Sequence, residues 1–165
     1  MSIVFCVALT LLVSYLLGCF NGAVMTSHFV IKDDVRKHGS GNAGLTNFYR
    51  TYGAKYALGV IVCDMGKTLV ACLIGGYLFW FMARDWTLGV LLAGIGCELG
   101  HMFPAFYGFK GGKGILCGGT LALLLDWRVA LVVSVLVIWC HRENIVRLVQ
   151  GRENKFRWHS GPPKE

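Results

Sequence analysis

The first 31 residues of the chain contain no Asp, Glu, Lys or Arg, and no other feature limits the fold as much. About 20 apolar helical residues cross the hydrocarbon core of a bilayer, so this run is long enough for a membrane span. Ser14, Asn21 and Ser27 interrupt it, but their hydroxyl and amide groups can bond within the helix or to neighbouring helices. No basic region precedes the run and no small-residue cleavage site is evident. We therefore expect a retained first span, Met1 to Ile31, and not a signal peptide.

Three further apolar stretches follow, separated by short polar or glycine-rich segments: Tyr56–Ala83, Trp86–Tyr107 and Ile115–Cys140. The chain is 55% hydrophobic and 15% charged, whereas soluble domains carry about 25% charged residues. We therefore predict a single all-α domain over residues 1–165. It is expected to be a polytopic transmembrane helical bundle with about four apolar segments.

The fourth stretch conflicts with the distribution of positive charge. Lys and Arg prefer the cytoplasmic side, which places both glycine-rich segments inside. A single crossing by Ile115–Cys140 would then put the basic tail outside. A hairpin broken at Asp126–Arg128 would return the tail, but each arm would be only roughly 17 Å long against a core of about 30 Å. Either the stretch is re-entrant, or the chain lacks residues between 115 and 140.

The net charge of +7 would suggest a nucleic-acid partner for a soluble protein. In this chain, basic loops at an anionic membrane surface explain the charge, and we expect no nucleic acid. Some of the cations could also hold anionic substrates. The seven cysteines form no C-x-x-C pair and lie in or beside apolar runs, where Cys behaves as a small hydrophobic residue. We expect neither a disulfide framework nor a metal site.

Two glycine-rich segments lie at the ends of predicted spans: "GSGNAGLTNFYR" at residues 39–50 and "GFKGGKG" at residues 108–114. The first contains the G-x-G-x-x-G pattern of dinucleotide folds, but a basic extension of a membrane helix precedes it where a strand is required. The second does not fit Walker A, because Gly114 follows Lys113 where Ser or Thr is needed. Both segments still combine glycine turns, which expose backbone N–H groups, with a helix N-terminus, and this combination favours phosphate.

Side chains suited to phosphate accompany these turns. The candidates are Gly39, Ser40, Gly41, Asn42, Thr46, Asn47 and Arg50 in the first segment, and Lys110, Gly111, Gly112, Lys113 and Gly114 in the second. Arg can bind a phosphate in a bidentate manner, and Lys supplies a compact point charge. His141, Glu143 and Asn144 begin a polar tail, which is also typical of an amphipathic helix on lipid headgroups. Together these segments predict a site for one or two phosphates at the lipid boundary.

Two pairs of ionisable residues lie inside the predicted spans. Asp64 and Lys67 are three residues apart and share a helix face, and Glu98 and His101 repeat this spacing just before the second glycine-rich segment. Ionisable groups at this depth are costly and face a polar interior or one another. Each pair can be a self-satisfied local pair. Alternatively, Asp64 and Lys67 support loop residues at the membrane surface, and His101 carries a proton.

The chain resembles the bacterial acyl-phosphate:glycerol-3-phosphate acyltransferases, which are integral membrane enzymes. Three motifs carry the resemblance: "GSGNAGLTNFYR" at 39–50, "HMFPAFYGFKGGKG" at 101–114 and "HRENIVRLVQGRENK" at 141–155. The Asp64–Lys67 pair is similar to an Asp-x-x-Lys in the family's next span. The resemblance implies a fatty acyl phosphate as donor, glycerol-3-phosphate as acceptor and lysophosphatidic acid as product.

The resemblance also implies roles for individual residues. By position, the residues that match the family's essential ones are Ser40, Arg50, Lys110, His141 and Asn144, and glycines 111, 112 and 114 match its glycerol-3-phosphate loop. No cofactor is implied. The expected location is the bacterial cell membrane, with the motifs facing the cytoplasm, and a candidate partner is the soluble enzyme that makes acyl phosphate.

The chain departs from the family in length. Family members have seven helices, and several crossings separate their second and third motifs, whereas only Ile115–Cys140 lies between those motifs here. This difference indicates an internal deletion or an incomplete chain. Two other functions stay open: a small membrane transporter or headgroup binder without chemistry, and an inactive truncated relative.

Overall fold

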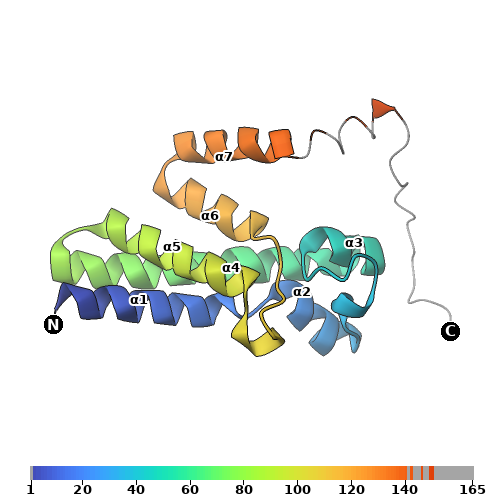
Figure 1. The fold of residues 1–165 in the computed structure, drawn as a ribbon, viewed down its shortest axis with the longest axis horizontal. Coiled ribbons are helices and arrows are strands. Elements are labelled where there is room, and N and C mark those ends of the chain that lie inside the picture. The colour runs from blue at the N-terminus through green and yellow to red at the C-terminus, as the bar shows by residue number, and fades with distance from the viewer. Residues whose placement is uncertain (1, 141, 143–145, 147–148, 151–165) are drawn as a thin grey trace.

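A computed structural model of the chain describes residues 2–140, 142, 146, 149 and 150, and these residues form helices without any strand. The α-helices are α1 (Ile3–Gly18), α2 (Gly22–Met25), α3 (Leu45–Tyr52), α4 (Ala54–Ala83), α5 (Trp86–Met102), α6 (Ile115–Leu125) and α7 (Trp127–Cys140). A π-helical segment covers Thr26–Ile31, and short 3₁₀ turns cover Val35–Lys37 and Ala105–Tyr107. In Figure 1, α1, α4 and α5 lie side by side as the core of the bundle. The predicted all-α class is confirmed.

Three stretches of the described chain are long and apolar enough to cross a membrane: Ile3–Ile31, Ala54–Ala83 and Trp86–Tyr107. They coincide with the first three predicted spans. Between the second and third, Arg84 adopts a left-handed conformation, and Asp85 accepts a hydrogen bond from the backbone N–H of Leu88 to begin α5. A tight turn therefore joins these two spans.

Glycines let the three long helices approach closely. A Cβ on Gly89 of α5 would collide with the carbonyl of Gly75 on α4. Similarly, a Cβ on Gly100 of α5 would collide with the carbonyl of Tyr15 on α1. Small residues at such contacts allow the backbone packing that holds membrane helices together.

The first span is not one continuous helix, which differs from the simplest expectation for an uncharged run. Helix α1 ends at Gly18, and Asn21 starts α2 by accepting a hydrogen bond from the backbone N–H of Val24 at 3.1 Å. Ser14 bonds within its own helix, to the carbonyl of Thr10 at 2.7 Å, as expected. The break at residues 19–21 exposes backbone groups that the helix would otherwise pair.

The fourth apolar stretch is broken at Asp126, the first residue of the predicted break. Asp126 is extended (φ −166°, ψ 133°), and its Oδ1 accepts a hydrogen bond from the backbone N–H of Arg128 at 2.7 Å. Helix α6 has 11 residues and α7 has 14, so at 1.5 Å per residue they are about 16 and 21 Å long. Neither reaches the 30 Å of a hydrocarbon core, and α7 turns back towards the end of the bundle that holds α3 (Figure 1). Two short arms of this kind are what the re-entrant alternative predicts, and they are also what a chain lacking residues between 115 and 140 would leave.

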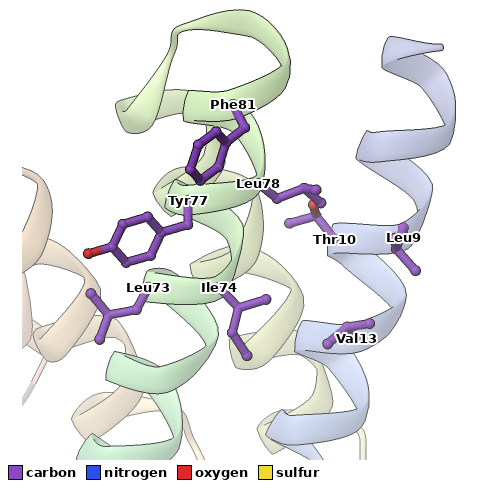
Figure 2. A pocket seen from close by; sticks show the side chains of 8 residues that line it. All are labelled: Leu9, Thr10, Val13, Leu73, Ile74, Tyr77, Leu78 and Phe81. Carbon is purple, nitrogen blue, oxygen red and sulfur yellow. The ribbon is translucent and has the colours of Figure 1, made fainter. Parts of the chain in front are cut away.

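An apolar groove of about 460 Å³ lies between α1 and α4 (Figure 2). The parts of the two helices that line it lie towards the end of the bundle away from α3 (Figure 1). Its lining residues are Leu9, Thr10, Val13, Leu73, Ile74, Tyr77, Leu78 and Phe81. No charged side chain lines the groove. A phosphate would be costly there, because a buried charge requires charged or hydrogen-bonding partners. The groove is therefore not suited to the predicted phosphate site.

Candidate active site

The first glycine-rich loop is built around the buried side chain of Asn47 on α3. Its Oδ1 accepts a hydrogen bond from the backbone N–H of Ser40 at 3.0 Å. Its Nδ2 lies 3.0–3.1 Å from the carbonyl oxygens of Val35, His38 and Asn42. These partners use all of the amide hydrogens, so the expected donation from the Asn47 side chain to phosphate is wrong. Asn47 instead fixes the shape of the loop.

Backbone N–H groups of both glycine-rich loops are also paired within the protein. The N–H of Gly41 donates to the His38 carbonyl at 2.9 Å, and those of Gly111 and Gly112 donate to the carbonyls of Met102 and His101 at 3.2 and 3.1 Å. The prediction that these turns expose consecutive amides to phosphate is therefore wrong at these positions. Their glycines serve shape: Gly39, Gly41 and Gly114 have positive φ, and a Cβ on Gly39 would collide with Asn47.

The two glycine-rich loops meet each other. A Cβ on Gly112 would lie 2.8 Å from the carbonyl oxygen of Ala43 and would collide with Nε2 of His101. The guanidinium of Arg36, just before the first loop, lies over the ring of Tyr107 with 5.2 Å to the ring centroid. Segments about 70 residues apart thus form one surface at the ends of the spans.

The loop region before α3 contains its own charge cluster. The Asp33 carboxylate accepts hydrogen bonds from the backbone N–H of Asp34 at 2.6 Å and from the Tyr52 hydroxyl at 2.9 Å, and it pairs with His38 Nε2 at 2.8 Å. Chiefly through the Asp34 N–H and His38, these contacts hold the pKa of Asp33 below its usual value. Burial and the bond to Asp33 raise the pKa of Tyr52, so its hydroxyl stays protonated as a donor.

Arg36 is already neutralised by a carboxylate. Its Nε and Nη2 donate to the two oxygens of Asp34 at 2.9 and 2.8 Å. This bidentate contact lowers the pKa of Asp34. Lys110 and Lys113 differ: both are exposed, and among the described residues neither forms an ion pair with a carboxylate. The second loop therefore carries cations available to an anionic ligand.

Asp64, Lys67 and His101 form a buried cluster beneath the loops. Lys67 Nζ lies 2.9 Å from Asp64 Oδ1 and 2.9 Å from His101 Nδ1, and His101 Nδ1 lies 3.5 Å from Asp64 Oδ1. All three side chains are buried. The expected Asp64–Lys67 pair is confirmed, and it includes a residue from the next helix.

His101 contacts Asp64 and Lys67 and forms no ion pair with Glu98, so the alternative of a local Glu98–His101 pair does not hold. His101 faces α4, whereas the Glu98 carboxylate lies against the start of α6. A Cβ on Gly118 would be 3.0 Å from both carboxylate oxygens, and one on Gly114 would collide with the carboxylate. A carboxylate is favourable at a helix N-terminus because unpaired N–H groups there carry partial positive charge.

A metal ion does not fit this cluster. Asp64, His101 and Cys117 each offer a ligand atom, and these atoms lie within 4.8 Å of one another. However, Lys67 places an ammonium 2.9 Å from both Asp64 and His101, so a positive charge already occupies the space between them. A divalent cation would have to displace it against charge repulsion.

The other predicted residues are placed as follows. Ser40, Thr46 and Arg50 are exposed on the first loop and α3, and Asn42 is half-buried with its Oδ1 buried and unpaired among the described residues. His141, Glu143 and Asn144 lie outside the described residues.

The sequence analysis did not predict that Asn21 connects the first loop to the first span. Its Nδ2 donates to the carbonyl of Ala43 at 2.9 Å, which ties the first loop to the broken first span. The signal was present: Asn-Gly is a turn dipeptide, and Asn21–Gly22 lies inside an apolar run. Arg36 and Tyr107 gave no comparable signal, because their contact depends on how the loops fold.

A sequence profile of the family described as "Glycerol-3-phosphate acyltransferase" matches residues 8–135. The glycerol-3-phosphate acyltransferase of Thermoanaerobacter pseudethanolicus is 32% identical over 193 aligned positions, covering 90% of this chain and 94% of that protein. The one of Mycoplasmopsis agalactiae is 39% identical over 155 positions, covering 90% of this chain and 63% of that protein. Since 193 positions exceed the 165 residues of the chain, the first alignment includes positions without a counterpart here.

Two crystal structures of PlsY, an integral membrane glycerol 3-phosphate acyltransferase, have a similar fold. The glycerol 3-phosphate form has a TM-score of 0.64 and 28% identity, with 92% of this chain and 96% of that chain covered. The lysophosphatidic acid form has a TM-score of 0.63 and 27% identity, with 92% and 95% covered.

Proposed function

Because the chain belongs to the glycerol-3-phosphate acyltransferase family, we propose that it transfers a fatty acyl group from acyl phosphate to glycerol-3-phosphate in phospholipid biosynthesis. The product is lysophosphatidic acid. One observation of the fold carries the proposal: two glycine-rich loops join at the span ends, and the cations of one loop have no carboxylate partner in the described chain. Such a surface suits two phosphate-bearing substrates at the lipid boundary.

The phosphates are held by side chains more than by loop amides, since the amides of Gly41, Gly111 and Gly112 bond to carbonyls. Lys110 and Lys113 supply positive charge from the second loop, and Arg50 and Ser40 supply a guanidinium and a hydroxyl from the first segment. Hydrogen bonds to charged groups contribute about 1.5–3 kcal/mol each. Two such contacts would together contribute about 3–6 kcal/mol.

Asn42 is the candidate for orienting the acceptor hydroxyl. Its Oδ1 is buried and has no hydrogen-bond partner among the described residues, which is costly for a polar atom. A hydroxyl of glycerol-3-phosphate would satisfy this oxygen. The substrate's phosphate and hydroxyl would then be held by different groups, which fixes the direction of attack.

The reaction needs positioning more than acid catalysis. The acceptor hydroxyl oxygen forms a bond to the acyl carbonyl carbon, the bond from that carbon to the phosphate oxygen breaks, and inorganic phosphate departs with the electron pair. A substrate phosphate oxygen takes the hydroxyl proton. His101 is less suited to this, because its Nδ1 is 2.9 Å from the Lys67 ammonium. The cations screen the repulsion between the two phosphates.

The three spans and the hairpin support a cell-membrane protein with both glycine-rich loops and the tail in the cytoplasm. A cytoplasmic site can receive acyl phosphate from the soluble enzyme that makes it. The Thermoanaerobacter relative has positions without a counterpart here. We place the missing residues between 115 and 140, because the two arms there are too short to cross a membrane.

Transport is the competing function, and a broken helix within a span is its usual sign. The first span is broken at residues 19–21, but the carbonyls of Gly18 and Phe20 and the N–H of Gly22 are bonded to Lys67 and Asp64. Those groups are therefore not available to a transported substrate. The break favours a structural role within an enzyme.

The test is to incubate membranes containing the chain with labelled glycerol-3-phosphate and, separately, acyl phosphate, acyl-CoA or acylated carrier protein. Lysophosphatidic acid is expected only with acyl phosphate. Matched membranes without the chain give the background. Product from acyl-CoA alone would refute the donor, and no product from any donor would refute acyl transfer by this chain.

A further inference from the structure

We propose that Asp64, Lys67 and His101 are positioning residues that set both glycine-rich loops relative to each other through the break in the first span. The inference rests on the proposed acyl transfer only where activity is measured. Its structural part concerns this chain's own backbone and requires no substrate.

Lys67 caps the end of α1. Its Nζ lies 3.1 Å from the Gly18 carbonyl oxygen and 2.8 Å from that of Phe20, in addition to its contacts with Asp64 and His101. An ammonium has three hydrogens, so these four acceptors already saturate it. Lys67 is therefore unsuited to binding substrate and suited to closing a broken helix inside a membrane, where unpaired carbonyls are costly.

Asp64 caps the start of α2 from the same helix face. Its Oδ1 accepts a hydrogen bond from the backbone N–H of Gly22 at 3.0 Å. A Cβ on Gly22 would lie 2.8 Å from the Val60 carbonyl, so glycine permits this close approach. The ion pair thus pairs with backbone groups on both sides of the break and defines where α2 begins.

The break in turn positions the first loop. Asn21, the last residue of the break, donates to the Ala43 carbonyl at 2.9 Å, and both residues are buried. A shift of α2 would therefore move residue 43 and the loop around it.

His101 connects Lys67 to the second loop and so helps to position that loop. Its Nδ1 contacts Lys67, its carbonyl accepts the N–H of Gly112 at 3.1 Å, and its Nε2 lies against Gly112. The Ala43 carbonyl contacts the same glycine. The two loops therefore meet at Gly112. Each loop is also connected to Lys67, the second through His101 and the first through Asn21 and the break in the first span.

The structural test is hydrogen exchange of the detergent-purified full chain, read by mass spectrometry. Peptides covering residues 36–48 and 101–114 report the two loops. In Lys67→Met, exchange in both peptides should accelerate by about tenfold or more, as expected for the loss of charge-assisted hydrogen bonds. Lys67→Arg should recover part of the protection, because it restores the cation.

Lys67→Met leaves the Asp64 carboxylate buried and unpaired, so it can fail to fold. The double variant Asp64→Asn with Lys67→Met removes both charges and keeps an amide oxygen for Gly22. It should fold and still show faster exchange in both loops. Thr10→Val is the matched control: Thr10 is buried in α1 at the far end of the bundle, and its hydroxyl has no partner among the described residues. Exchange in the loops should not change.

The kinetic test uses the same variants with acyl phosphate and glycerol-3-phosphate. Per folded molecule, Lys67→Met should lower kcat and raise the KM for glycerol-3-phosphate, and Lys67→Arg should reverse part of both changes. Wild-type constants in folded Lys67→Met would refute a positioning role.

Unchanged exchange in both loops of the double variant would overturn the inference. A change in peptide 101–114 alone would overturn the coupling to the first loop. If the wild-type chain makes no lysophosphatidic acid but both loops respond as expected, the proposed function fails and the positioning network stands.

Discussion

Replacing Gly112 by Ala tests most directly whether the meeting point of the two loops matters. Gly112 is not among the residues with positive φ, so Ala fits the backbone and the effect is steric. The added methyl would lie 2.8 Å from the Ala43 carbonyl oxygen and would collide with the His101 ring, which is held by Lys67. Neither neighbour can move freely, because one is backbone and the other is buried.

Overpacking of this kind costs about 1–3 kcal/mol. If the loops separate to accommodate the methyl and the loss appears in the transition state, kcat/KM should fall between about 5-fold and 150-fold, at tenfold per 1.36 kcal/mol. The assay is lysophosphatidic acid formation from acyl phosphate at varied glycerol-3-phosphate, normalised to folded protein. Thermal melting in detergent shows whether the fold survives.

Gly119→Ala is the matched control for the same chemical change. Gly119 lies on α6 with nothing within 4 Å of an added Cβ, and Ala in a helix is favoured over Gly by about 1 kcal/mol. Its activity should equal that of the wild type. Gly112→Ala with more than half of wild-type kcat/KM would refute the argument that the loops must touch there.

Arg50→Ala and Lys110→Ala should each abolish transfer while membrane insertion, judged by carbonate extraction, is unchanged; wild-type turnover would remove that residue from the site. Asp33→Asn should lower stability at pH 7 by about 0.2–1 kcal/mol, as for other exposed pairs. The pKa of Asp33 is lower in the folded protein than in the unfolded chain, where it is near 4. The carboxylate therefore adds its full contribution to the free energy of unfolding above pH 4, and this contribution is lost as the pH falls through the folded pKa. Melting curves from pH 7 to pH 3 should therefore converge for Asp33→Asn and the wild type. A cysteine introduced at Gln150 should react with an impermeant maleimide only from the cytoplasmic side, and labelling of intact cells would contradict the proposed orientation.

The spans were predictable because they depend on local composition. Runs of apolar residues fix where a helix can cross a membrane whatever its neighbours are, and Arg84–Asp85 ends one run and begins the next. The same reasoning located the Asp64–Lys67 pair, since a spacing of three places both side chains on one face.

The site was less predictable because its contacts join distant segments. The spacing of three residues made a local pair equally plausible for Glu98 with His101 and for Asp64 with Lys67. In the structure, however, His101 faces α4 and Glu98 faces α6. The glycine content of the two loops similarly predicted backbone N–H groups that are free to bind phosphate. Whether an amide is exposed depends on which carbonyl lies nearby, and Met102 and His101 provide carbonyls for the second loop.

The α6–α7 hairpin bears on the conflict between the expected side of the basic tail and the length of the fourth apolar stretch. A single crossing from 115 to 140 would place the tail on the opposite side from the second glycine-rich loop, whereas two short arms that do not cross would leave it on the same side. Helix α7 carries a stripe of large apolar residues at steps of four: Trp127, Leu131, Val135 and Trp139. Each of them is at least 58% exposed. The helix therefore packs chiefly on α6 and leaves an apolar face for lipid or further helices.

Restoring residues within the hairpin would not alter the side on which the tail lies. Arms of 11 and 14 residues need about 9 and 6 more to reach the 20 that a span requires. The Thermoanaerobacter alignment has 193 positions and includes 90% of the 165 residues, so about 44 of its positions have no counterpart in this chain. Lengthening both arms converts a re-entrant hairpin into two crossings in opposite directions. The number of crossings would be odd in both forms, as the proposed placement of the tail and the two glycine-rich loops on one side of the membrane requires.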